Sequence, residues 1–184
     1  MDPMKTDHRK ATIAFDYRFE NNRIDPRVTT TDYPVVVEPP ISKRADSSVC
    51  ISGADFGKDF ELVLSFTVQK PLSRSEACLA LCWDFTDSIT AGLSIASRTM
   101  KVMYFYDEED KKDYEKEFYF RPRLEIGAHQ LSLRKIKNEY YFFVNGRFEK
   151  KLPCKRFNGR KISVSSVGAY AVIHNLRLLY LDGA

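Results

Sequence analysis

Glu115 and Glu117 come nearest, in type and spacing, to a catalytic pair of carboxylates. Two residues apart on an extended strand, their side chains share a face at a separation of about 7 Å. Glycoside hydrolysis uses two carboxyl groups, one as an acid and the other as a nucleophile or base. However, Lys116 and the charged run from Asp107 to Asp113 indicate an exposed strand edge at this place. We therefore expect no catalytic residues in this chain, and we keep hydrolysis as an alternative.

Aromatic side chains are a second group of interest, because a sugar ring stacks on an exposed Trp or Tyr while polar groups hold its edge. Tyr104 and Tyr106 alternate with Met103 and Phe105, so one of these two pairs faces outward from a strand. An outward pair of tyrosines would form a binding platform, or would simply cover a sheet edge. The candidate ligand-binding residues are Trp83, Tyr104, Tyr106, Tyr119 and Tyr141.

Basic side chains gather late in the sequence. This basic patch consists of Lys150, Lys151, Lys155, Arg156, Arg160 and Lys161. Such a patch can attract phosphate or sulfated glycans, or it can be the solvated rim of a folded domain. The formal net charge of +4, from 29 basic and 25 acidic residues, lacks the strong asymmetry of a dedicated nucleic-acid-binding protein. We expect no nucleic-acid partner.

Asp84 and Asp87 flank a predicted turn beside Trp83. Carboxylates in a loop can hold calcium, but two of them supply few of the about six to eight oxygen ligands that this ion takes. We expect aspartates that cap the turn, with calcium as the alternative, and no other cofactor. His8, His129 and His174 are too scattered along the chain to suggest a catalytic triad.

The four cysteines do not have the spacing of a zinc site or of a disulfide scaffold. Cys78 and Cys82 share one face of a predicted strand about 13 Å apart, too far to bond each other. We expect buried free thiols, which favour a reducing compartment such as the cytoplasm. Cys50 and Cys154 complete the set.

Residues 1–10 are polar and charged, without the apolar segment of a signal peptide. We expect them to form a disordered tail or an expression-derived extension. No later stretch is long and apolar enough to cross a bilayer, so we expect no membrane span. The 184 residues of the chain suit one domain, which we place at residues 11–182.

Alternating apolar residues with turn residues between them predict an all-β protein, a two-sheet antiparallel β-sandwich of about a dozen strands. The clearest alternation runs from Phe60 to Val68, which we expect at the centre of a sheet. Residues Ala11–Phe19 predict a strand with Ile13, Phe15, Tyr17 and Phe19 on one face. Prolines surround the Tyr33–Glu38 segment, so it belongs at a sheet edge or outside the sheets.

The stretch from His129 to Leu181 predicts an antiparallel meander. Its first two strands are joined to the rest by Asn145-Gly146, a pair that tolerates the positive backbone angles of a two-residue turn. Tyr140, Phe142 and Val144 alternate along the second strand, and we expect them to fill the core. The charged run from Asp107 to Asp113 predicts a hairpin tip.

Several segments of the chain resemble bacterial modules of the concanavalin A-like lectin/glucanase superfamily, including laminin G-like jelly-roll modules. The resemblance extends from about Ile13 to Tyr180. The resembling segments are Phe15-Asp16, Phe19-Glu20-Asn21-Asn22, Asp59-Phe60-Glu61-Leu62, Leu81-Cys82-Trp83-Asp84, Leu131-Ser132-Leu133-Arg134-Lys135-Ile136, Tyr141-Phe142-Phe143-Val144-Asn145-Gly146, Gly159–Val167 and Val172-Ile173-His174-Asn175-Leu176-Arg177.

This resemblance implies a jelly roll and a non-catalytic module that binds a carbohydrate or a protein partner, as part of a larger protein or assembly. Two alternatives remain open. One is a glycoside hydrolase of the same fold, with Glu115 and Glu117 or Asp84 as acids. The other is a structural subunit that pairs with neighbouring chains through edge strands such as Tyr33–Glu38. The sequence leaves the oligomeric state open.

Overall fold

The structure is a computed structural model that describes residues 11–18, 23–24, 35–36, 45–68, 79–85, 89–96, 99–108, 111–121, 124–167 and 171–181. These residues form fourteen β-strands and no helix. The strands are Ala11–Arg18 (β1), Arg23–Ile24 (β2), Val35–Val36 (β3), Ala45–Ser52 (β4), Phe60–Val68 (β5), Leu79–Phe85 (β6), Ile89–Ala96 (β7), Thr99–Glu108 (β8), Lys111–Phe120 (β9), Gly127–Ile136 (β10), Glu139–Val144 (β11), Arg147–Pro153 (β12), Lys161–Val167 (β13) and Ala171–Leu181 (β14). Within the described ranges there is accordingly no apolar helix that could span a membrane.

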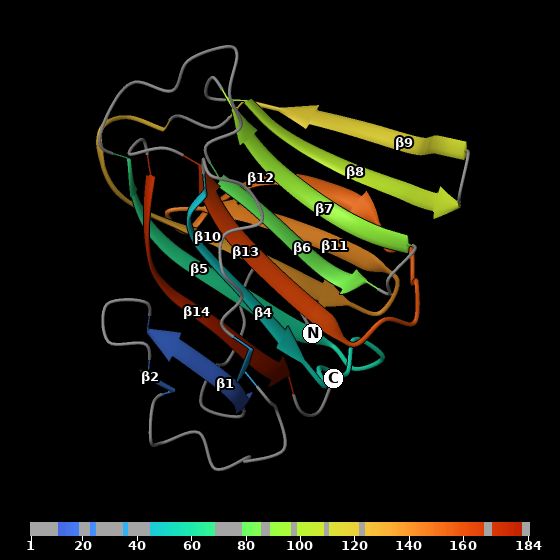
Figure 1. Cartoon of the computed structure of the whole chain (residues 1–184), viewed down its shortest axis with the longest axis horizontal. Helices are drawn as coiled ribbons and strands as arrows, with labels where there is room; N and C mark the ends of the chain where they lie inside the picture. The colour runs from blue at the N-terminus through green and yellow to red at the C-terminus, as the bar shows by residue number, and fades with distance from the viewer. Residues whose placement is uncertain are drawn as a thin grey trace.

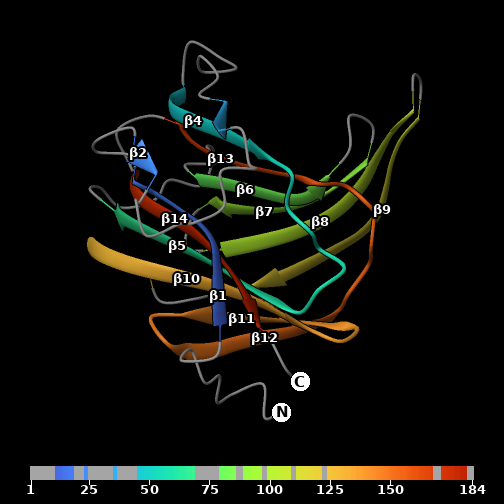
Figure 2. The same cartoon turned by 90° about the horizontal axis from the view of Figure 1, so that it is seen from below.

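The strands form two antiparallel sheets of seven strands each, which lie as two layers (Figures 1 and 2). Sheet A has the order β12-β11-β10-β5-β14-β1-β2, and sheet B has the order β3-β4-β13-β6-β7-β8-β9. Because consecutive strands often belong to different sheets, the chain crosses from one layer to the other several times. The predicted all-β, two-sheet antiparallel sandwich is confirmed.

Strand β5 lies at the centre of sheet A, between β10 and β14, as its alternation predicts. Its apolar set is at most 1% exposed and faces sheet B: Phe60, Leu62, Leu64, Phe66 and Val68. The residues between them point to the opposite side of sheet A, which we call the outer face. The core therefore lies between the two sheets.

The predicted meander is confirmed over β10, β11 and β12, which pair in sequence order within sheet A. Its predicted continuation to Leu181 is wrong, because β13 belongs to sheet B and β14 pairs with β5 and β1. At the turn between β11 and β12, Asn145 has a φ of 52° and Gly146 a φ of 76°. These left-handed conformations are the ones that a two-residue hairpin turn with this twist requires. The Asn145 side chain also accepts a hydrogen bond from the Gln130 N–H at 2.9 Å, which joins the turn to β10.

The side chains of β11 divide between the two faces of sheet A. Tyr140, Phe142 and Val144 lie in the core, which confirms the prediction for this strand. Tyr141 and Phe143 lie on the outer face, in a small second cluster. Strand β11 is therefore covered on both sides.

The prediction that Ile13 shares a face with Phe15 and Tyr17 is wrong. The register of β1 against β14 shifts between Ile13 and Phe15, as at a β-bulge. Phe15 and Tyr17 are buried in the core, whereas Ile13 pairs with Leu179, whose β5 partner Glu61 lies on the outer face. One additional residue in the strand thus reverses the side on which Ile13 lies.

The strand edges partly match their predictions. Strand β3, within the proline-flanked segment, is the edge strand of sheet B, as predicted. The charged run does not form a hairpin tip over its whole length, because β8 continues to Glu108 and β9 begins at Lys111. Glu108 pairs with Lys111 and Asp107 with Lys112. The paired strands therefore extend through most of the run.

Candidate functional site

A pocket lies at one end of the sandwich, where two connections cross between the sheets. Residues 53–59 lead from β4 of sheet B to β5 of sheet A, and residues 154–160 lead from β12 of sheet A to β13 of sheet B. The Ala54 N–H donates to the Arg160 carbonyl at 3.0 Å and joins the two connections. The pocket has a volume of about 330 Å³ and is lined by Ala54, Asp55, Phe56, Arg156, Asn158, Gly159 and Arg160.

The first wall of the pocket, residues 54–56, is anchored to the core. Phe56 is 1% exposed and its ring meets that of Phe60 edge to face, with 5.2 Å between the centroids. The Asp55 N–H donates to the Tyr180 hydroxyl at 2.7 Å. Asp55 Oδ1 accepts a hydrogen bond from the Gly57 N–H at 2.9 Å, a local turn that aspartate favours. The Asp55 carboxylate is therefore held at the exposed rim.

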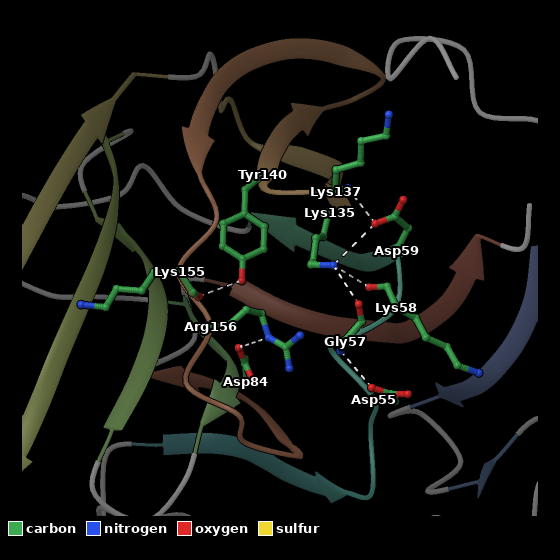
Figure 3. Close-up of polar contacts among 10 residues, drawn as sticks. All are labelled: Asp55, Gly57, Lys58, Asp59, Asp84, Lys135, Lys137, Tyr140, Lys155 and Arg156. Carbon is green, nitrogen blue, oxygen red and sulfur yellow. Dashed lines mark hydrogen bonds and ion pairs between the residues drawn. The ribbon is translucent and has the colours of Figure 1, made fainter. Parts of the chain in front are cut away.

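Lys135 binds the same connection from the protein interior, as the dashed lines to residues 57–59 show (Figure 3). It is only 4% exposed, and its Nζ donates to the carbonyls of Gly57 and Lys58 at 3.2 and 2.9 Å. The Asp59 carboxylate lies 3.5 Å from this Nζ and accepts the Lys137 N–H at 2.7 Å. A buried charge requires such partners, and here they hold the backbone of residues 57–59 in one place.

Asp84, at the end of β6, holds the second wall. Its side chain is 0% exposed, and Oδ2 accepts hydrogen bonds from Arg156 Nε at 2.9 Å and from the Phe157 N–H at 3.0 Å. Burial raises the pKa of Asp84, while the Phe157 N–H, the Arg156 charge and the Gly159 N–H oppose that rise. Asp84 thus pairs with a cation that lines the pocket (Figure 3).

The second wall presents two guanidinium groups. Arg156 donates from Nε to Asp84. Its Nη1 points toward Gly57 in the opposite connection, where it lies 3.6 Å from the position that a Cβ atom on this glycine would take. Arg160 is exposed and donates from Nη2 to the Gly53 carbonyl at 3.1 Å. Asn158 has a φ of 57°, a conformation that asparagine tolerates better than most residues. The wall therefore carries two cations and one amide.

Tyr140, Trp83 and Cys154 lie behind the second wall and do not line the pocket. The Tyr140 hydroxyl donates to the Lys155 carbonyl at 3.4 Å, and the Trp83 and Tyr140 rings meet edge to face at 5.7 Å. Burial raises the pKa of the Tyr140 hydroxyl and also that of the Cys154 thiol. A thiol with a raised pKa is a poor nucleophile at neutral pH.

The prediction that Trp83 binds a ligand is wrong. Trp83 is 0% exposed and packs against Tyr140 and Phe142 in the core, so it offers no ring face to a ligand. Tyr141 lies on the outer face at 9% exposure, and its hydroxyl donates to Glu139 at 2.5 Å.

The platform and hydrolase hypotheses fall mostly on side chains that lie outside the described part of the structure. For Tyr104, Tyr106 and Tyr119, the structure describes only the backbone, within β8 and β9. The same holds for Glu115 and Glu117 in β9. Asp84, the other acid of the hydrolase alternative, is buried in its pair with Arg156.

The structure divides the basic patch in two. Lys150 and Lys151 belong to β12, the edge strand of sheet A, where lysine discourages pairing with other chains. Lys151 also pairs with Glu139 at 2.7 Å. Arg156 and Arg160 line the pocket. Lys155 precedes them, and Lys161 begins β13.

The predicted role of Asp84 in capping a turn or holding calcium is also wrong, because its carboxylate is buried and bonded to Arg156 and Phe157. Asp87 lies outside the described residues. Among those that are described, no group of three or more His, Cys, Asp or Glu side chains is arranged to hold a metal ion. Cys82 and Cys154 are free thiols; Cys78 and the Cys50 side chain lie outside the description.

Two polar residues of the pocket, Asp55 and Asn158, were missed from the sequence. Asn158 directly precedes Gly159, and Asp55 lies two residues before Gly57. Asp or Asn close to a glycine indicates a turn, so the turns could have been found. That the two turns face each other depends on pairing between distant strands.

No protein-family model matches this sequence, and a search of curated proteins finds no match. Solved structures do match in fold. The receptor-binding domain of botulinum neurotoxin D is 8% identical, with a TM-score of 0.64 over 94% of this chain and 50% of that one. The carbohydrate-binding module CBM66 from Bacillus subtilis is 13% identical, with a TM-score of 0.52 over 80% of this chain and 95% of that one.

The galectin LEC-6 of Caenorhabditis elegans is 11% identical, with a TM-score of 0.56 over 78% of this chain and 94% of that one. This chain spans about half the length of the neurotoxin binding domains that it matches. By name, two of these three similar proteins are a receptor-binding domain and a carbohydrate-binding module. The chain therefore has the concanavalin A-like β-sandwich fold.

Proposed function

We propose that this protein is a non-catalytic binding module that recognises a carbohydrate in the pocket between residues 53–59 and 154–160. The observation that carries the proposal is the composition of the pocket walls. Asp55 offers a carboxylate acceptor, whereas Asn158, Arg156 and Arg160 offer donors. A sugar carries many hydroxyl groups, each of which donates one hydrogen bond and accepts others, so a mixed set of donors and acceptors suits it.

Size and rigidity support this function. A volume of about 330 Å³ lies at the lower end of the range of small-molecule sites and suits one saccharide unit. The walls are held by Asp84 and Lys135 from beneath, so little conformational entropy is lost when a ligand binds. The similar solved structures include a carbohydrate-binding module and a receptor-binding domain.

A glycan microarray carrying neutral and acidic glycans tests the proposal with the whole chain as the probe. We expect the wild-type protein to bind a subset of the glycans and Asn158→Gly to lose at least about tenfold in affinity, the equivalent of one good hydrogen bond. Glycine adopts the φ of 57° at this position, so the variant removes the amide and keeps the backbone.

Asn145→Gly is the matched control, because Asn145 also has a positive φ but lies at the other end of β11 from the pocket. It should bind as the wild type does. If the wild-type protein binds no glycan on the array, or if both variants bind like the wild type, the proposal is wrong.

A further inference from the structure

We infer that the pocket selects an acidic saccharide unit, whose anionic group is bound by Arg156 and Arg160 and whose hydroxyl groups face Asp55. This inference rests on the proposed function and deepens it. It is carried by the arrangement of charge across the pocket: both guanidinium groups come from the 154–160 wall, and the carboxylate comes from the 53–59 wall.

The first step concerns Arg156. Its Nε is occupied by Asp84, which is 0% exposed, while its side chain keeps 31% exposure. A guanidinium has five N–H donors in a fixed plane. Fixing Nε from beneath therefore fixes the plane and leaves the terminal amino groups, which lie toward the pocket, to bind a planar carboxylate or another oxyanion.

The second step concerns the charge balance at this end of the molecule. Among the described residues at this end, Asp84 pairs with Arg156 and Asp59 lies 3.5 Å from Lys135. Asp55 is the carboxylate that lines the pocket, and Arg156 and Arg160 are the cations that line it. Two lining cations against one lining carboxylate favour an anion.

The third step concerns Asp55, which would repel a simple anion. Its position on the wall opposite the arginines makes the pocket polar from one side to the other. A ligand with an anionic group at one end and hydroxyl groups at the other satisfies both walls. Uronic and sialic acids have this chemistry, while a free phosphate or a neutral sugar satisfies only one of the walls.

The glycan array tests the inference through the affinities of acidic glycans compared with those of neutral ones. Glycans with a uronate or sialic acid unit should bind at least about tenfold more tightly than neutral glycans of the same backbone, as expected for a charge-assisted hydrogen-bond pair. Chemical reduction of the carboxylates to alcohols should remove this preference. Binding of neutral and acidic glycans with equal affinity would overturn the inference and leave the proposed function standing.

Charge-changing variants place the selection in the pocket. Arg160→Gln should lose the preference for acidic glycans, and the matched control Arg147→Gln, at an arginine that is 73% exposed on β12, should keep it.

Asp55→Asn should strengthen binding of acidic glycans severalfold, because it removes a repelling charge and keeps an acceptor for the Gly57 N–H. If Arg160→Gln and Arg147→Gln weaken acidic binding equally, a diffuse surface charge explains the preference and the inference fails. Absence of any glycan binding would end the proposed function and the inference together.

Discussion

Among the described residues, Glu61, Asp84 and Asp16 are buried carboxylates that each pair with an arginine, and the first two have different surroundings. On the outer face of sheet A, Glu61 accepts a hydrogen bond from Arg134 Nε at 2.8 Å, and the two residues are direct partners across β5 and β10. At the pocket, Asp84 accepts one from Arg156 Nε at 2.9 Å, although Arg156 lies in a connection between the sheets. The two bonds are nearly identical in length, so the difference between the pairs lies in what surrounds each arginine.

Arg134 contacts neighbouring strands of its own sheet. Its guanidinium lies 4.3 Å from the centre of the Phe143 ring and is 13% exposed, and Ser132 donates to the same Glu61 oxygen. Arg156 is 31% exposed and faces a pocket of about 330 Å³. Arg134 thus packs against a neighbouring strand, whereas Arg156 is held by Nε and its terminal amino groups lie toward the pocket.

Removal of Asp84 gives the largest expected effect. Asp84→Ala should lower the free energy of unfolding by about 3–5 kcal/mol, because it leaves a half-buried arginine and the Phe157 N–H without their partner. Denaturation by urea measures this loss. Glu61→Ala, the equivalent change on the outer face, should cost less, since Arg134 keeps its contact with Phe143. An equal or greater loss for Glu61→Ala would contradict the difference drawn between the two pairs.

Removal of the Arg134 charge separates stability from binding. Arg134→Gln should cost about 2 kcal/mol, from one charged hydrogen bond and a cation–π contact, without changing the affinity for glycans. Denaturant titration and the glycan array provide the two measurements on the same sample. Loss of glycan binding in this folded variant would move the ligand site to the outer face.

The pH dependence of stability tests the environment of Asp84. Burial raises the pKa of Asp84 above its ordinary value in spite of Arg156, so the folded state binds this proton more tightly than the unfolded state does. The contribution of the group to the free energy of unfolding therefore falls as the pH rises from the ordinary aspartate pKa through the raised one.

Asp84→Asn lacks this titration. The stability of the wild type minus that of Asp84→Asn should therefore decline with rising pH over the same window, as measured by urea denaturation at a series of pH values. A difference that grows with pH would mean that attraction by Arg156 outweighs burial.

The smallest effect is expected at Tyr141. The Glu139 carboxylate accepts its hydroxyl proton and, with partial burial, raises the pKa of Tyr141 to about 12. Because this hydrogen bond lies at the surface, Tyr141→Phe should change the free energy of unfolding by no more than about 0.5 kcal/mol and leave glycan binding unchanged. A marked decrease in glycan affinity would restore Tyr141 as a ligand-binding residue.

Predictions that depend on residues close in sequence were correct, whereas several that depend on contacts between distant strands were wrong. The strands β5 and β11 and the Asn145-Gly146 turn were predicted correctly, because alternation and turn chemistry depend on neighbouring residues. The position of Ile13 was not, because the bulge in β1 is set by its pairing with β14. We expected Trp83 to bind a ligand and Asp84 to flank a turn, yet both residues are buried.

By itself, the sequence determined the all-β class, the central strand and the β10-β11-β12 part of the meander, since each results from a two-residue repeat or a local turn. Only the tertiary structure decided where the polar residues act. It brought residues 53–59 and 154–160 to the same end of the sandwich and placed Arg156 on Asp84, 72 residues away. The physical reason is that these contacts depend on the crossing of the chain between two sheets, and no short sequence pattern encodes that crossing.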